Sequence, residues 1–129
     1  MDDDRTSYDV LLAETDPELV TMQLDIGWAY IAGVDPIAMF TNNPGRFELW
    51  HLKDVFGINT VDRKLSPNER VNSMAFTPVG VGQIDYKKVF DHAGTAGLKH
   101  FFVEQDNSAS FGDSLAAARV SFENLSKVL

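Results

Sequence analysis

The sequence of 129 residues has no cysteine, which excludes disulfide bonds, thiolate catalysis and zinc–thiolate sites. It also has no apolar run close to the roughly 20 residues that a membrane-spanning helix needs. The first residues are acidic and polar, whereas a secretory signal begins with basic and apolar residues. We therefore expect a cytoplasmic protein without a membrane partner.

Basic residues are scarce as well. The chain has 11 Lys and Arg against 19 Asp and Glu, so its formal net charge is −8. The densest basic group is Arg63 and Lys64 with Arg70 nearby, in a region of loop-like composition. Proteins bind nucleic acids and anionic lipids mainly through clustered Lys and Arg. Nucleic acid is therefore not an expected partner.

The residues that are present make an ordinary globular composition, with 44% apolar, 11% aromatic and 23% charged residues. The length suits one domain with a real core. We expect residues 1–6 to form a disordered acidic N-terminus and residues 7–129 to form the domain.

Two helices are predicted in the N-terminal part. Apolar residues lie at helical spacing in residues 8–20, and Thr15 with Glu18 three positions later is a capping-box signature. Pro17 suits the first turn of the new helix that this signature predicts. Residues 35–45 predict a short helix that begins after an aspartate N-cap and ends at Asn-Pro-Gly.

Two more helices are predicted in the C-terminal part. Residues 84–97 predict a helix with Asp85 as its N-cap and an end near Gly94 or Gly97. Residues 113–129 form the clearest amphipathic pattern. Its apolar stripe consists of Leu115, Ala118, Phe122 and Leu125.

Three short apolar segments, 20–26, 46–52 and 99–106, predict strands between these helices. The stretch 54–79 has little periodicity and predicts a long loop, either a functional lid or a disordered segment. Because strands and helices alternate, the pattern favours an α/β fold with parallel strands and right-handed crossovers.

Each predicted strand ends in a side chain that binds metals. These residues are Asp25, His51 and Glu104. The carboxyl ends of parallel strands meet at one edge of a sheet, so the three side chains are expected to converge. Two carboxylates and an imidazole suit Mn²⁺, Mg²⁺, Co²⁺, Fe²⁺ or Zn²⁺. Lys53 shares the face of His51 and is expected to anchor a substrate oxygen or phosphate.

A structural interpretation competes with this one, because any strand that leaves a core becomes polar. For each of the three residues taken alone, the structural interpretation is favoured. For the three residues together, the metal site and the structural interpretation are equally supported. Other candidates are weaker: His92 lies on a predicted helix surface and His100 at the far end of its strand. The segment Gly80-Val81-Gly82 lacks the strand and helix context of a phosphate-binding loop.

The chain resembles the C-terminal part of the sugar phosphate isomerase/epimerase family, whose members have a xylose isomerase-like TIM barrel. The resemblance covers nearly the whole chain, with the Asp, His-x-Lys-Asp and Val-Glu-Gln-Asp segments in the expected order. The segments that carry it are "LLAETDPELVTMQLDIGWAYIAGVDPI", "PGRFELWHLKD", "VGVGQIDYKKVFDHAGTAGLKHFFVEQD" and "SFENLSKVL".

The resemblance implies a partial (β/α) TIM barrel of about three parallel βα units preceded by a helix. It implies that Asp25, His51 and Glu104 bind a divalent metal, with Glu104 as acid/base and Lys53 as a second catalytic residue. Trp28, Lys53 and Asp106 would contact a sugar or sugar phosphate. The implied reaction is proton transfer through an enediolate.

Two departures from the family are visible. Members often carry Gly-Glu-Gly where this chain has Gly80-Val81-Gly82. A complete barrel also takes about 250 residues, so the metal carboxylate and proton-transfer partner of the earlier strands lie outside this chain. A three-stranded remnant leaves sheet edges exposed, which predicts a homo-oligomer.

Three functions remain open. The first is a metal-dependent sugar isomerase or epimerase, complete only as an assembly or within a longer chain. The second is a non-catalytic half-barrel interaction module or truncated remnant. The third, an endonuclease of the same barrel class, is disfavoured by the acidic charge and the single lysine on the site side.

Overall fold

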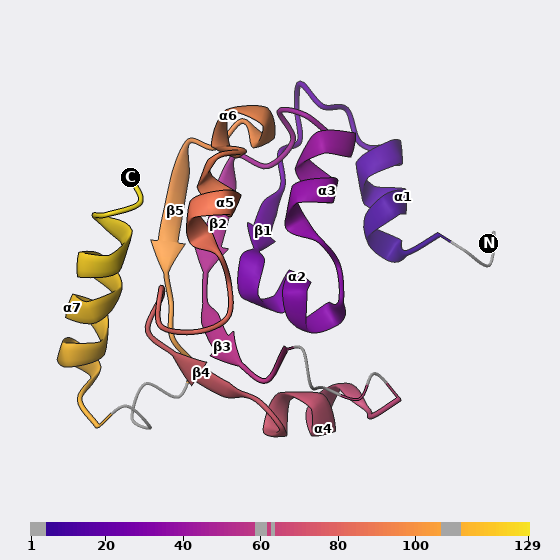
Figure 1. The fold of residues 1–129 in the computed structure, drawn as a ribbon. Helices are drawn as coiled ribbons and strands as arrows, with labels where there is room; N and C mark the ends of the chain where they lie inside the picture. Colours follow the sequence, from indigo (N-terminus) through magenta and orange to yellow (C-terminus); the bar gives the residue numbers. More distant parts are fainter. Residues whose placement is uncertain (1–4, 59–61, 63, 107–111) are drawn as a thin grey trace.

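The centre of the molecule is a parallel sheet of three strands in the order β1-β2-β5 (Figure 1). The structure is a computed structural model that describes residues 5–58, 62, 64–106 and 112–129. The parallel pairing of β1 with β2 and of β2 with β5 confirms the predicted parallel strands, although each strand is shorter than its sequence pattern. Their bounds are Gln23–Asp25 for β1, Leu49–Leu52 for β2 and His100–Val103 for β5.

Helices flank the sheet, with α7 beside β5 at one side of the molecule and α1 beyond α3 at the other (Figure 1). In the described part of the chain, no helix is long and apolar enough to cross a membrane. The helices are α1 Ser7–Glu14, α2 Ile26–Ala32, α3 Pro36–Asn42, α4 Pro67–Asn72, α5 Tyr86–Phe90, α6 Ala93–Ala96 and α7 Ser114–Leu125.

Aspartate caps begin several of these helices. The predicted caps Asp35 and Asp85 are confirmed, because each carboxylate accepts a backbone N–H of its first turn. Asp25 is a third cap: its Oδ1 accepts from Trp28 N at 2.9 Å, so α2 begins directly after β1. The prediction that the strand continues to residue 26 is wrong, because Ile26 already belongs to the helix.

The predicted helix start at Thr15 is also wrong. The Thr15 hydroxyl donates to Leu11 O at 2.6 Å and ends α1 instead of capping a new helix. Glu18 N donates to the Asp16 side chain at 2.9 Å, which closes a turn. The true capping box of α1 is formed by Thr6 and Asp9.

The stretch 54–79, predicted as a loop, contains regular structure. β3 (Asp54–Phe56) and β4 (Ala75–Thr77) pair in antiparallel orientation, and α4 lies between them. Ser66 and Glu69 form a capping box that begins α4. Strands of three residues are too short to show an alternating pattern, so β3 and β4 cannot be predicted from the sequence.

The helix predicted over 84–97 is divided into α5 and α6. Asp91 ends α5, and His92 occupies the N-cap position of α6 without a side-chain capping bond. The predicted stop at Gly97 is confirmed by its left-handed φ of 80°.

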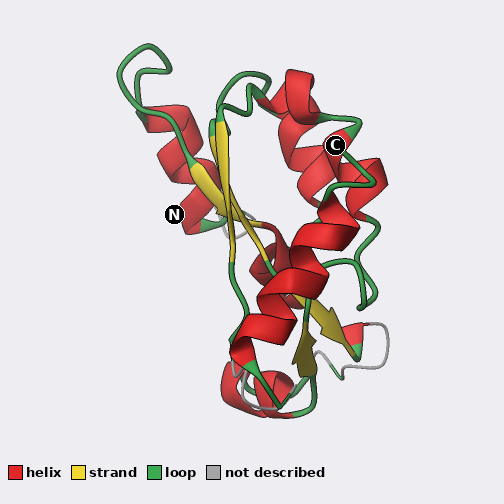
Figure 2. Cartoon of the chain, turned by 90° about the vertical axis from the view of Figure 1, so that its left-hand side faces the viewer, coloured by secondary structure: helices red, strands yellow, loops and turns green. Residues whose placement is uncertain are grey.

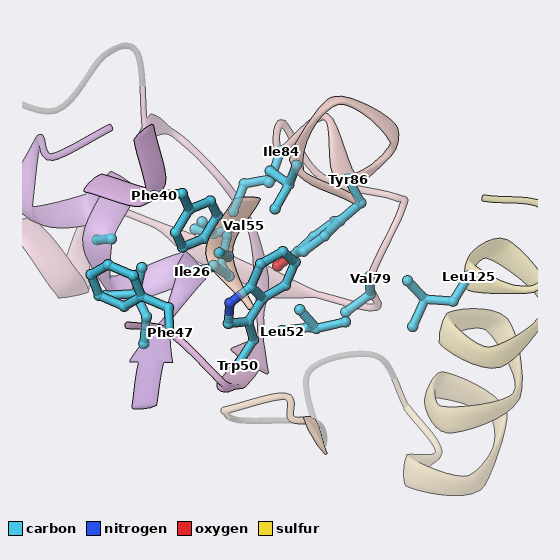
Figure 3. Close-up of a cluster of buried hydrophobic side chains, with 14 of the residues drawn as sticks. Ile26, Phe40, Phe47, Trp50, Leu52, Val55, Val79, Ile84, Tyr86 and Leu125 are labelled. Carbon is cyan, nitrogen blue, oxygen red and sulfur yellow. The ribbon is translucent and has the colours of Figure 1, made fainter. Parts of the chain in front are cut away.

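The core lies on the face of the sheet that carries Leu24, Trp50 and Leu52 (Figure 3). The Trp50 ring is fully buried and stacks on Phe40, with 4.8 Å between ring centroids. Side chains alternate along a strand, so Asp25 and His51 point away from this core to the other face. The packing therefore orients the two site residues.

The C-terminal helix turns a different face inward from the one predicted. Leu115 and Phe122 are 80% and 71% exposed, so of the predicted stripe Leu125 alone is buried. Ser121 Oγ accepts from Val79 N at 3.0 Å, which ties α7 to the loop before residue 80. Figure 2 views the molecule from the side of α7, and the helix lies in front of the sheet. Its buried residues are Ala117, Ser121 and Leu125.

Candidate metal centre

The parallel register brings the predicted metal ligands to one end of the sheet. Asp25 lies opposite His51, and His51 lies opposite Phe102. Glu104 follows two residues after Phe102, and its N–H donates to Leu52 O at 3.0 Å, so the strand direction continues. All three ligand side chains are therefore on the same face of the sheet, as the sequence predicts.

The three side chains offer ligand atoms that all lie within 4.8 Å of one another. His51 Nδ1 is 2.8 Å from Glu104 Oε2, and each of the three residues is partly buried. Two carboxylate oxygens and one imidazole nitrogen form a donor set that suits Mn²⁺, Co²⁺ or Zn²⁺ and, with added water, Mg²⁺. The geometry fits a divalent metal.

Lys53 lies at the centre of a group of carboxylates. Its Nζ is 3.3 Å from Asp25 Oδ2, 3.1 Å from Glu104 Oε2 and 3.1 Å from Asp106 Oδ2. The lysine side chain is 9% exposed. With formal charges, three carboxylates and one ammonium leave two negative charges. A divalent cation would neutralise them.

These contacts shift two ionisation equilibria. Burial disfavours the Lys53 ammonium, but hydrogen bonds to Glu104 and Asp106 and the charge of Asp25 outweigh burial and raise the pKa of Lys53. The hydrogen bonds from His51 and Lys53 lower the pKa of Glu104. Both shifts favour the charged forms, which a metal ligand and an anchor for an anionic oxygen require.

Gln23 supports the imidazole from the side away from the carboxylates. Its side-chain amide contacts His51 Nε2, while His51 Nδ1 faces Glu104. Side chains that contact one ring nitrogen of a histidine set the orientation of its ring. Gln23 therefore holds the His51 ring with Nδ1 toward Glu104.

Asp54, which follows Lys53, is a buried carboxylate held by main-chain donors. Its side chain accepts backbone N–H groups at 2.9–3.1 Å from Val55, Gly80, Gly82 and Ile84. Burial raises the pKa of Asp54, and the four backbone hydrogen bonds oppose that rise. These hydrogen bonds hold the start of β3, next to Lys53 in the chain, against the loop 80–84.

Two further contacts hold the backbone of Lys53. The Tyr86 hydroxyl donates to Lys53 O at 2.7 Å. Gly27 of α2 packs on the other side, where a Cβ atom would lie 2.7 Å from Lys53 Cβ and 2.9 Å from Lys53 O. The backbone of Lys53 is therefore held by Tyr86 of α5 and by Gly27 of α2.

Replacing Gly27 with alanine should lower the free energy of unfolding by about 1–3 kcal/mol, because the added methyl group overlaps Lys53. Gly94→Ala is the matched control. A Cβ at Gly94 meets no atom of the described residues within 4 Å, so this change should leave stability unchanged or raise it by up to about 1 kcal/mol. Urea denaturation measures both; equal stability of the two variants would contradict the tight contact.

A cavity of about 450 Å³ borders the group of carboxylates at Asp106, while none of the three predicted metal ligands lines it. Trp28 and Phe76 line it, with 5.8 Å between their ring centroids, and Lys53 Nζ lies 5.8 Å from the Trp28 ring. Asp106 lines the same cavity. The structure thus places Trp28, Lys53 and Asp106 together, while their substrate-binding roles stay predictions.

Sequence reasoning missed several supporting residues. The sequence pattern indicates no role for Gln23, Asp54 and Phe76, and it predicts only a weak phosphate-binding loop at the two glycines of 80–82. Their backbone N–H groups do bind an anion, but the anion is the Asp54 carboxylate. The sequence feature that could have indicated this contact is the combination of the Lys53-Asp54 pair with the Gly80-Val81-Gly82 segment.

The two histidines that the sequence set aside lie away from the centre. His92 is at the start of α6 and His100 at the start of β5, and neither belongs to the metal-capable group found among the described residues.

No family model matches the sequence. Curated proteins do: the chain is 35% identical over 104 residues to an inosose dehydratase of Geobacillus thermodenitrificans, which covers 76% of this chain and 35% of the relative. An inosose dehydratase of Clostridium tetani is 37% identical over 86 residues, 64% of this chain and 29% of the relative. The chain therefore spans about a third of the length of these relatives.

A solved structure shares the fold. A sugar phosphate isomerase/epimerase from Parabacteroides distasonis superposes with a TM-score of 0.66 at 24% identity, over 88% of this chain and 32% of the solved one. The open sheet of three parallel strands matches part of that larger fold and is not a closed barrel. Over about three quarters of its length the chain is similar in sequence to inosose dehydratases, and it has the partial barrel fold that its resemblance to sugar phosphate isomerases/epimerases implies.

Proposed function

We propose that this chain carries the divalent-metal centre of an enzyme that transfers a proton beside the carbonyl group of a sugar or sugar phosphate. The observation that carries the proposal is the convergence of Asp25, His51 and Glu104 at the carboxyl ends of three parallel strands. A metal held there would act as a Lewis acid on the substrate oxygens. The similarity to sugar-modifying enzymes supports the substrate class.

The roles of the protein residues follow from their contacts. Glu104 lies between His51 and Lys53 and, with its lowered pKa, is ionised and able to accept a proton from the substrate. The Lys53 ammonium provides a positive charge for a substrate oxygen or phosphate. Asp106 holds that ammonium at 3.1 Å from the opposite side.

The cavity lined by Trp28, Phe76 and Asp106 suits a small polyhydroxylated substrate. The Trp28 and Phe76 rings form an apolar wall that can contact C–H groups and exclude water. Asp106 supplies hydrogen-bond acceptors for hydroxyl groups at the edge of the same cavity. This combination of an apolar wall and few polar groups fixes a sugar in one orientation.

Isomerisation or epimerisation is the first candidate reaction, and dehydration is the second. The sequence identity of 35% to an inosose dehydratase favours dehydration as the reaction with the natural substrate. Both reactions begin with removal of a proton from the carbon next to a carbonyl group, so the same residues serve either one. They differ in the product, since only dehydration releases water.

Deuterium exchange tests the proposal. In D₂O with Mn²⁺, the chain should catalyse exchange of the hydrogen next to the carbonyl of an inosose or a ketose phosphate, measured by NMR. Glu104→Gln should reduce the exchange rate on the order of 100-fold, as expected for the loss of a residue that serves as both acid/base group and metal ligand. Mn²⁺ binding without exchange above the uncatalysed rate would overturn catalysis and leave a non-catalytic half-barrel module.

A further inference from the structure

A second cavity, of about 300 Å³, lies between α2 and α4 (Figure 1). Trp28 and Val71 line this cavity and also the cavity of about 450 Å³ that borders the carboxylates, so the two spaces adjoin. The wall of the second cavity is apolar except for one arginine. Its lining residues are Trp28, Ile31, Ala32, Arg70 and Val71.

That arginine, Arg70 of α4, has a donor that the protein does not satisfy. Its Nε is buried and has no hydrogen-bond partner among the described residues. None of the ion pairs found in the described part of the chain includes Arg70. A buried donor without an acceptor costs free energy unless a ligand or water supplies the acceptor. The second cavity therefore offers a positive charge and an open hydrogen-bond donor.

Arg46 shows the contrast with a structural arginine. Its Nε is also buried without a partner among the described residues, but its terminal N–H groups donate to Leu12 O at 3.0 Å and to Thr15 Oγ1 at 2.8 Å. Arg46 thus ties β2 to the end of α1. No such bond from the Arg70 side chain is found within the described ranges, so its guanidinium has no comparable structural role.

The other cation near the cavities, Lys53, is a poor site for an anionic group. Its Nζ lies 3.1–3.3 Å from oxygens of Asp25, Glu104 and Asp106. A phosphate or carboxylate placed there would meet three like charges. An uncharged carbonyl or hydroxyl oxygen would not, so Lys53 suits that end of a substrate.

We propose that Arg70 binds an anionic group, a phosphate or a carboxylate, at the end of the substrate remote from its carbonyl. The planar guanidinium presents paired N–H donors that match the oxygens of either group. Trp28 separates the two ends: Lys53 Nζ is 5.8 Å from its ring, and Arg70 lines the cavity on which the same residue borders. Arg70 would then select acidic sugars over neutral ones. The position of the carbonyl end rests on the proposed function.

Titrations of the chain with three sugars test this selection. With Mg²⁺ in every sample, NMR chemical shifts measure the affinity for fructose, fructose 6-phosphate and glucuronate. We expect at least one acidic sugar to bind about 10-fold or more tightly than fructose, as charge-assisted hydrogen bonds provide. Tighter binding of fructose 6-phosphate identifies a phosphate site, and tighter binding of glucuronate identifies a carboxylate site.

Variants assign the effect to Arg70. Arg70→Gln should reduce the affinity for the acidic sugar to that for fructose while the affinity for fructose stays the same, which shows that the rest of the site is intact. Arg70→Lys keeps the charge without the planar fork and should retain part of the preference. Arg119→Gln is the matched control, because Arg119 is exposed on α7 and lines neither cavity.

Three results would overturn the proposal: equal affinities of the wild type for all three sugars, no detectable binding of the acidic sugars, or the same preference in R70Q and R119Q. The outcome is separate from that of the deuterium exchange test. A preference that depends on Arg70 in a chain without exchange would support the anion site and overturn catalysis. Exchange without the preference would leave catalysis standing and overturn the role of Arg70.

Discussion

His51→Ala should abolish most of the affinity of the chain for Mn²⁺, with a loss on the order of 100-fold or more, since even residues behind a metal ligand contribute 10–100-fold. His51 supplies the only nitrogen in the group of metal-capable residues found in the described structure. Its removal leaves two carboxylates whose charge is partly offset by Lys53. Isothermal titration with Mn²⁺ measures the change.

His92→Ala provides the control for this titration. His92 is partly buried at the start of α6, and its Nδ1 contacts Lys88 O at 3.0 Å, so it serves the helix and not the centre. Wild-type affinity is expected for this variant. Identical weak binding by wild type, H51A and H92A would show that Mn²⁺ binds elsewhere.

Asp54→Ala should lower the free energy of unfolding by about 3–5 kcal/mol, because it leaves several buried N–H groups without an acceptor. The Asp54 side chain is fully buried and accepts four backbone N–H groups. A loss of this size is a large part of the 5–15 kcal/mol that stabilises a typical domain. Urea denaturation followed by circular dichroism measures it.

Two comparison variants make the result interpretable. Asp54→Asn keeps the shape and one acceptor oxygen, so it should remain folded with an intermediate loss of stability. Asp91→Ala removes an exposed carboxylate paired with Lys87 at 3.3 Å and should change stability by less than about 1 kcal/mol. If D54A and D91A were equally stable, the loop 80–84 would not depend on the buried carboxylate.

The sequence was sufficient to place the metal-capable residues. Asp25, His51 and Glu104 each end an apolar run, and parallel strands in register bring such ends together. Parity along the strand also placed Lys53 on the correct side. These predictions succeeded because the period of a strand is short and its direction in an α/β fold is fixed.

The hairpin beside the site could not be predicted in the same way. β3 and β4 have three residues each and pair through Val55 and Phe76, so no alternating pattern develops. Helix α2 was not predicted because most of its residues are buried, so the helix has no polar face that would mark it in the sequence. Packing against the rest of the protein, and not a local sequence pattern, determines the structure of α2 and of the hairpin.

The face of α7 shows a further limit of pattern reading. Leu115, Ala118 and Phe122 form a stripe that predicts burial, yet the helix is tied to the protein through Ser121 and Leu125. A strongly apolar stripe identifies a surface that needs a partner but does not say which one. In this chain Ala118 and Phe122 of the stripe line a groove between β5 and α7, and Leu115 does not.

In the proposed function, Asp25, His51 and Glu104 hold one divalent cation. Diffraction from crystals grown with Mn²⁺, collected at the manganese absorption edge, locates this cation. We expect a single strong anomalous peak at about 2.0–2.3 Å from one atom of each of the three side chains, the range of metal–oxygen and metal–nitrogen bonds. A peak at another place, or none between these residues at saturating Mn²⁺, would contradict it.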